Sequence, residues 1–150
     1  MEDKRIESIL MAKYLLNKAY EKEIPMNMTK LQKMLYALDG ILLANGANVI
    51  NENCRAWQYG PVYPKVFAEL SNGYDFIKPF KDENFSSIEN NEHKDLIDRA
   101  TQLILDKLGD KTGRELSVWS HRKGSPWDNT PQNEVIDKTV IKRYFLYGKI

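Results

Sequence analysis

Hydrophobic residues recur at helical spacing in several stretches of the chain, most clearly in residues 29–46. The apolar positions there follow one face of an α-helix: Leu31, Met34, Leu35, Leu38 and Leu42. Thr29 and Gln32 have the spacing of an N-terminal capping box, and Gly46 suits the C-terminal cap. The same helix also has a polar face of mixed rather than basic character, formed by Lys30, Gln32, Lys33 and Asp39.

A second apolar stripe predicts a helix over about residues 4–22, formed by Ile6, Ile9, Leu10, Leu16, Ala19 and Tyr20. Pro25 ends this helix, because the residue before a proline disfavours α-helical geometry. The connector to the next helix is short, so we expect the two helices to form an antiparallel pair.

Three further helices are predicted in the C-terminal half. One covers about 92–108, with a stripe of Leu96, Ile97, Ala100, Leu103, Ile104 and Leu108, and ends at Gly109. Thr112 and Glu115 form a capping box that opens a helix to about His121. The last begins after Asp137 as N-cap and runs to about Tyr147, with Ile141, Phe145 and Leu146 expected to face inward.

The segments between these helices contain turn-forming and β-forming residues. Residues 55–59 predict a short strand, residues 60–64 a turn, and Pro64 the first position of a helix to about Leu70. Residues 71–90 predict a loop or loose hairpin, the most mobile stretch, and residues 135–136 a possible strand. The expected fold class is therefore mainly α (α+β): one compact helical domain, 1–150, of about five helices with a small two- or three-stranded β element.

The charge balance argues against a strongly basic binding protein. Lys and Arg number 22 and Asp and Glu 21, so a net charge of +1 gives no strong attraction to nucleic acid as a whole. Basic residues do lie on or near the last helix: Lys138, Lys142, Arg143 and Lys149. A nucleic-acid-binding regulatory protein therefore remains the alternative interpretation, although nucleic acid is an unlikely partner.

Cysteine and histidine content restricts the possible sites. A single cysteine, Cys54, excludes an internal disulfide and indicates a reducing compartment. With only two histidines, His93 and His121, a zinc site of the usual kind is disfavoured, so no metal is expected. No apolar run is long enough to span a membrane, and the charged start lacks a signal peptide, so we expect a cytoplasmic location.

Motifs for catalysis are lacking. The sequence contains no phosphate-binding loop, dinucleotide fingerprint, HExxH or GxSxG pattern, and its acidic residues form no recognisable pair. A nucleophile pair of His121 with a serine or Cys54 is conceivable, but no spacing supports it. We therefore expect no enzyme activity and no cofactor.

The segment AWQYGPVYPKVF, residues 56–67, places four aromatic rings around Gly60, Pro61 and Pro64. One interpretation is a rigid turn whose rings fill the core. The other is a partly exposed aromatic platform for a partner, because Tyr and Trp bind with little loss of entropy. Both can hold, with Trp57 largely buried and Tyr59 or Tyr63 exposed.

The segment LSVWSHRKGSPW, residues 116–127, has the same ambiguity. In one interpretation Leu116 and Trp119 belong to the core, His121 bonds a nearby backbone group, and Trp127 fills a gap. In the other, His121, Arg122, Lys123 and Trp127 form a binding edge.

These two segments, together with TKLQKMLYALDGILLANG (29–46) and VIDKTVIKRYF (135–145), resemble the Panacea domain family. This family was once called phage-associated GepA-like and includes the Soc-type antitoxin. The resemblance covers nearly the whole chain and is weakest over 72–92. One departure is visible, since Ser120 stands where the family usually has threonine, which keeps the hydroxyl.

The resemblance implies an antitoxin-type or phage- and prophage-associated protein that neutralises a cognate toxin by direct protein–protein contact. In the Soc-type member the domain acts as an adaptor to a ClpXP-type protease, so delivery to a protease is a second implied mode. The partner is expected to contact both unusual segments, through Trp57, Tyr59, Pro61, Val62, Tyr63, Lys65, His121, Arg122 and Trp127.

Overall fold

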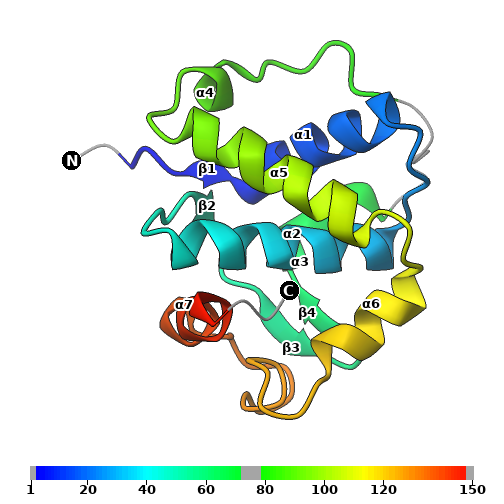
Figure 1. Cartoon of the computed structure of the whole chain (residues 1–150), viewed down its shortest axis with the longest axis vertical. Helices are drawn as coiled ribbons and strands as arrows, with labels where there is room; N and C mark the ends of the chain where they lie inside the picture. The colour runs from blue at the N-terminus through cyan, green and yellow to red at the C-terminus, as the bar shows by residue number, and fades with distance from the viewer. Residues whose placement is uncertain (1–2, 72–78, 148–150) are drawn as a thin grey trace.

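The computed structural model describes residues 3–71 and 79–147. Within these residues it has seven helices and four short strands (Figure 1). The helices are α1 (Ser8–Glu21), α2 (Met28–Ala44), α3 (Pro64–Leu70), α4 (Ser86–Glu89), α5 (Lys94–Leu108), α6 (Gly113–Ser120) and α7 (Lys138–Leu146). The strands are β1 (Ile6–Glu7), β2 (Ile50–Asn51), β3 (Arg55–Trp57) and β4 (Gly60–Val62). The expected mainly α fold with a small β element is confirmed.

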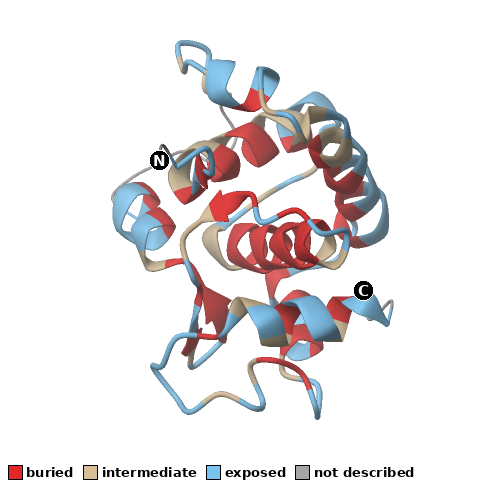
Figure 2. Ribbon diagram, turned by 90° about the vertical axis from the view of Figure 1, so that its left-hand side faces the viewer, coloured by how far each residue is buried: buried red, intermediate tan, exposed pale blue. Residues whose placement is uncertain are grey.

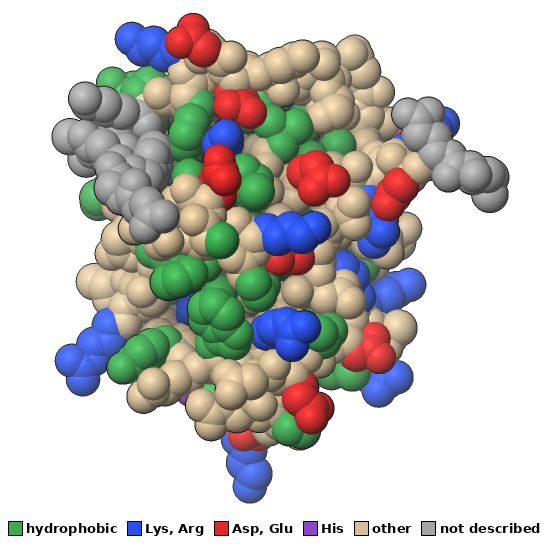
Figure 3. Space-filling view, turned by 180° about the vertical axis from the view of Figure 1, so that it is seen from behind, with side chains coloured by type: hydrophobic (Ala, Val, Ile, Leu, Met, Phe, Trp, Pro, Cys, Tyr) green, Lys and Arg blue, Asp and Glu red, His purple; other side chains and the backbone are tan. Residues whose placement is uncertain are grey.

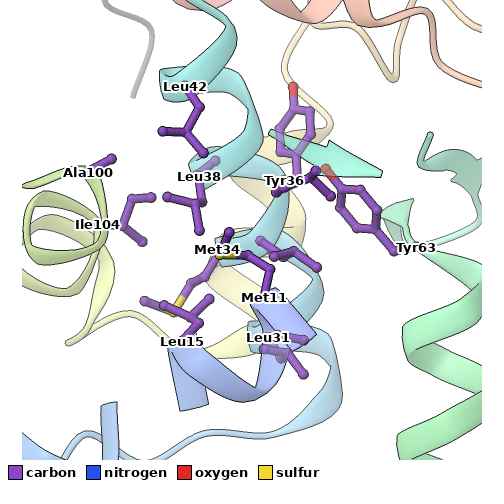
Figure 4. Close-up of a cluster of buried hydrophobic side chains, with 14 of the residues drawn as sticks. Met11, Leu15, Leu31, Met34, Tyr36, Leu38, Leu42, Tyr63, Ala100 and Ile104 are labelled. Carbon is purple, nitrogen blue, oxygen red and sulfur yellow. The ribbon is translucent and has the colours of Figure 1, made fainter. Parts of the chain in front are cut away.

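Helix α2 is the centre of the fold. Helices α1 and α5 pack on one side of it, and α6, α7 and the β3–β4 hairpin on the other (Figure 1). Thirteen of its 17 residues are buried, which is why its turns are red nearly all round in Figure 2. In Figure 4, Met11 of α1 and Ile104 of α5 point toward the Leu31–Leu42 face of α2, while Tyr63 lies beside Tyr36. The predicted apolar face of α2 is confirmed, since all five of its residues are fully buried.

The N-terminus of α2 differs from the prediction. Asn27, not Thr29, is the N-cap, and its Oδ1 accepts a hydrogen bond of 2.9 Å from the Lys30 amide. Gln32 cannot complete a capping box, because its side chain is bonded to the backbone of Tyr63, accepting from N at 2.8 Å and donating to O at 3.3 Å. The tertiary contact between Gln32 and Tyr63 thus replaces the predicted local contact between Gln32 and Thr29.

The C-terminus of α2 agrees with the prediction. Gly46 has a φ of 82°, and its amide bonds the Leu43 carbonyl while the Ala47 amide bonds the Leu42 carbonyl. This pair of hydrogen bonds is a Schellman motif, in which glycine is favoured because the left-handed backbone strains other residues.

Helix α1 begins later than predicted, because Ile6 and Glu7 form β1. This strand pairs in parallel with β2, with Ile6 opposite Ile50. The predicted stripe is also partly wrong, since Tyr20 is 50% exposed. The face that meets α2 is instead centred on Met11 and Leu15, both fully buried.

The C-terminal helices follow the predicted boundaries closely. The Thr112–Glu115 capping box is present in both directions, and Asp137 caps α7 by accepting from the Thr139 amide at 2.8 Å. Two inward-facing predictions are wrong, because Leu103 is 39% and Leu146 55% exposed.

The segment at 55–62 is a tight antiparallel hairpin. Arg55 pairs with Val62 and Trp57 with Gly60, so the turn lies at residues 58–59 and not at 60–64 as predicted. Gly60 has a φ of +117° and continues into β4. Pro64 does begin α3, as predicted.

Two further predictions concern segments outside the main helices, the strand at 135–136 and the mobile stretch at 71–90. The strand expected at 135–136 is reduced to a single bridge between Val135 and Arg55. Of the expected mobile stretch 71–90, residues 72–78 lie outside the described residues, and the remainder contains α4. Within the described ranges, no helix is long and apolar enough to cross a bilayer.

Candidate partner-binding surface

The two segments singled out in the sequence meet at the hairpin. The indole Nε1 of Trp127 donates a 2.6 Å hydrogen bond to the Trp57 carbonyl. His121 Nε2 lies 3.0 Å from the Gln58 carbonyl, and its ring packs on Trp127 with centroids 3.8 Å apart. Ser117 Oγ donates to the Tyr59 carbonyl. Helix α6 and the loop after it therefore hold the three successive carbonyls of residues 57–59 at the hairpin turn.

This fixed turn presents Tyr59 to solvent, with 67% of the residue exposed. Val118 on the outer face of α6 is equally exposed. A groove of about 880 Å³ runs between them. Its other lining residues are Asn27, Thr29, Thr112, Gly113, Arg114, Ser117 and His121.

A smaller cavity of about 450 Å³ lies on the other side of Tyr59. Trp57 and Phe67 line it, in edge-to-face contact with centroids 5.5 Å apart. Tyr59 and Thr29 line both hollows, which makes them one continuous surface. Hydrophobic side chains gather in the middle of the face seen in Figure 3. We call the residues Trp57, Tyr59, Phe67 and Val118, with both hollows, the hairpin surface.

Several predicted contact residues are not available to a partner. Tyr63 is fully buried, its hydroxyl donating a 2.7 Å hydrogen bond to Asp39 Oδ2, so its prediction as an exposed anchor is wrong. Pro61 and Val62 are buried too, because β4, the strand that contains them, packs against α2 and α6. Trp57, predicted to be largely buried, is only half-buried.

The remaining predicted residues divide into two groups. His121 and Trp127 are half-buried and hold the hairpin, as the core interpretation of that segment expects. Lys65 and Arg122 are exposed but line neither hollow of the hairpin surface.

Phe67 was absent from the predicted site, although it is 42% exposed and central to the small cavity. The signal for it lies in α3. Val66 and Leu70, four residues apart, form the buried face of this short helix, which places Phe67 off that face.

The buried polar residues of α2 were also missed. Lys30, Gln32, Lys33 and Asp39 are each at most 4% exposed, although charged residues are usually solvated. The helix side of Gln32, Lys33 and Asp39 also carries Tyr36 and Gly40, and a Cβ on Gly40 would lie 2.3 Å from the Phe145 ring. An aromatic and a glycine at helical spacing among polar residues were a signal that this side is packed as well.

Asp39 holds three elements together. Its Oδ2 accepts from Tyr63 and, at 2.9 Å, from Lys138 Nζ of α7. Burial raises the pKa of Asp39, while Lys138 and the Tyr63 hydroxyl oppose that shift. Because the Lys138 ammonium pairs with Asp39, it does not contribute to a basic surface on the last helix. Lys149, also predicted for that basic group, lies outside the described residues.

His121 and Cys54, the two candidate nucleophile-pair residues, lie in different environments. The ring nitrogens of His121 both face backbone carbonyls, of Ser117 and Gln58. Cys54 is fully buried, and burial raises the pKa of its thiol. Among the described residues, no three His, Cys, Asp or Glu side chains gather as a metal site.

The comparison with protein families addresses this same part of the chain. The family model described as "Antitoxin SocA-like, Panacea domain" matches residues 31–128, well over half of the chain. The chain belongs to the Panacea-domain antitoxin family. The matched residues include most of α2, the hairpin and the loop with His121 and Trp127.

A curated relative agrees with this membership. The Panacea-domain chain is 30% identical over 161 residues to the antitoxin SocA of Caulobacter vibrioides (strain NA1000 / CB15N). The alignment covers 97% of this chain and 85% of the relative. No solved structure matches. The resemblance seen in the sequence is thereby confirmed at the level of the family.

Proposed function

We propose that this chain is an antitoxin that neutralises a cognate toxin by direct protein–protein binding through the hairpin surface. The observation that carries the proposal is the exposed Tyr59 on a turn whose neighbouring carbonyls are held by Ser117, His121 and Trp127. Exposed aromatic side chains are the usual anchors of protein interfaces. A turn that is already fixed loses little entropy when the partner docks.

The shape of the surface supports a protein partner. Tyr59 and Val118 rise from the two sides of the large groove, and Trp57 and Phe67 continue the apolar area beyond Tyr59. Exposed apolar residues that are contiguous rather than scattered favour a docking role. Tyr59, Phe67 and Val118 are exposed and Trp57 is half-buried, so this apolar area is open to a partner.

Delivery of the bound toxin to a protease is a finer version of the same proposal. An adaptor needs a second contact for the protease, at a place that toxin binding leaves free. Lys142 and Arg143 are exposed on α7, away from the lining of both hollows, and are suited to that contact. Comparison of toxin half-life in cells with and without the protease separates delivery from simple blocking.

The test is rescue of growth by co-expression with the toxin encoded by the neighbouring gene. Tyr59→Ala should weaken toxin binding by about 2 kcal/mol or more, roughly 30-fold, and reduce rescue. Tyr147→Ala is the matched control, because Tyr147 is 76% exposed but lies beside α7, outside the hairpin surface. Thermal melts of both variants should match the wild type. Full rescue by Tyr59→Ala would place the toxin site elsewhere.

A further inference from the structure

Among the described residues, Lys30 and Lys33 are buried and Lys138 is partly buried. Lys138 and Lys30 have close acceptors. Lys138 Nζ donates to Asp39 Oδ2 and, at 2.9 Å, to the Ile50 carbonyl. Lys30 Nζ donates to the Gly109 carbonyl at 2.6 Å. Lys33, only 1% exposed, donates to a single acceptor among the described residues, the Pro61 carbonyl, at 3.3 Å. An ammonium group has three N–H donors, so most of its hydrogen-bonding capacity is unused.

Lys33 also lines the small cavity of the hairpin surface. The lining residues include the rings of Trp57 and Phe67 and the amides of Gln58 and Asn133. None of them is acidic. The cavity is therefore lined by a lysine together with apolar and amide side chains, and none of its lining residues carries a negative charge.

Burying a cation without a counter-ion costs free energy, and this cost lowers the pKa of the cation. Burial lowers the pKa of Lys33 to about 8. The charged form still prevails at neutral pH, and an anion that enters this desolvated place is attracted more strongly than one in water.

We propose that the cavity receives the carboxylate of an aspartate or glutamate of the toxin, which pairs with Lys33 Nζ while flanking toxin residues pack on Trp57 and Phe67. This inference rests on the proposed function. The occupant is a protein side chain because the cavity continues past Tyr59 into the large groove, so a segment seated in one extends along the other. Trp57 and Phe67 supply apolar contact, and the ammonium selects an acidic residue.

The experiment compares Lys33→Met with wild type in two measurements, toxin affinity at pH 7 and thermal melting of the free protein. Methionine keeps the length and removes the charge. We expect toxin affinity to fall by roughly 30-fold or more, as when one partner of a desolvated charge pair is removed. The free protein should melt at a higher temperature, because its unpaired charge is gone.

Lys30→Met is the matched control, since Lys30 is a buried lysine of the same helix that lines neither hollow. It should lower the melting temperature and leave the affinity of the folded protein unchanged. A double-mutant cycle then pairs Lys33→Met with Asp→Asn and Glu→Gln changes in the toxin. One toxin position should lose its effect in the Lys33→Met background.

The outcomes separate the two proposals. If the wild-type protein does not bind the toxin, the proposed function fails and this inference fails with it. If the wild type binds and Lys33→Met binds equally well, the carboxylate inference is wrong while the function stands. If Lys33→Met lowers both the melting temperature and the toxin affinity, Lys33 has a structural role and the inference is also wrong. Lys30→Met, the control, should lower the melting temperature only.

Discussion

At the scale of single residues, the polar side chains of α2 separate what the sequence could reveal from what it could not. The hydrophobic positions were predictable, because leucines at helical spacing have one plausible environment. The burial of Lys33 and Asp39 was not predictable, because a charged residue is buried only where residues distant in the sequence pair with it or hydrogen-bond to it. Those distant residues, Pro61, Tyr63 and Lys138, have no local signal in the sequence.

Lys33 should make the stability of the free protein depend on pH in a defined way. Its pKa falls from an ordinary 10.5 to about 8 on folding, so the folded state binds fewer protons between these values. The stability cost is fully present below pH 8 and disappears as the pH rises toward 10.5. Lys33→Met should therefore be more stable than wild type at pH 7, by roughly 3 kcal/mol.

Urea unfolding of both proteins at several pH values measures this difference. Cys54 ionises in the unfolded chain over part of the same range, but it is common to both proteins and cancels. A difference in the free energy of unfolding that stays constant from pH 7 to pH 10.5 would show that the Lys33 charge is not the cause.

At the scale of elements, the local signals were reliable where no tertiary contact competed. The Thr112–Glu115 box and the Gly46 terminus formed as predicted. The capping box predicted for Gln32 did not form, because the amide oxygen and the amide nitrogen of its side chain are both hydrogen-bonded to the backbone of Tyr63. The strand expected at residues 55–59 is present as the shorter β3, but the turn expected at 60–64 is wrong, since Gly60 and Pro61, typical of turns, form β4 here.

Gly60 gives a prediction at this scale. A Cβ there would lie 2.5 Å from Ser120 Oγ and 2.6 Å from Lys33 Cε, and the φ of +117° strains any other residue. Gly60→Ala should destabilise the fold by about 3 kcal/mol, combining strain with overpacking. Gly124→Ala is the matched control, with a φ of +86° but nothing within 4 Å, and should cost only about 1 kcal/mol. Chemical denaturation that gives equal losses would contradict the close approach at Gly60.

At the scale of the molecule, α2 packs against both β4 and α6, the elements beside the proposed hairpin surface. The sequence singled out residues 56–67 and 116–127, and the structure brings the two segments into contact through Trp127 and His121. Which side chains face outward was not predictable. Exposure of Tyr59 and burial of Tyr63 depend on the hairpin's register and on α2 behind it.

Asp39 is the residue that joins α2 to the hairpin and to α7. Asp39→Asn removes the charge that Lys138 needs and should destabilise the protein by about 3–5 kcal/mol, as expected when one partner of a buried ion pair is lost. Adding Lys138→Met should recover part of the loss, because no unpaired ammonium then remains. Urea melts of the single and double variants test this. A double variant less stable than Asp39→Asn alone would show that Lys138 contributes independently of Asp39.

The bond between Asp39 and Lys138 spans 99 residues of sequence, and this separation has a consequence for synthesis. As the chain leaves the ribosome, α2 appears early, but the side that carries Asp39 and Gly40 stays uncovered until α7 has emerged. Contacts this distant form slowly, and an unfinished core is open to proteases. A newly made molecule therefore passes through an interval in which this side of α2 is exposed, and that interval ends only when α7 has packed against it.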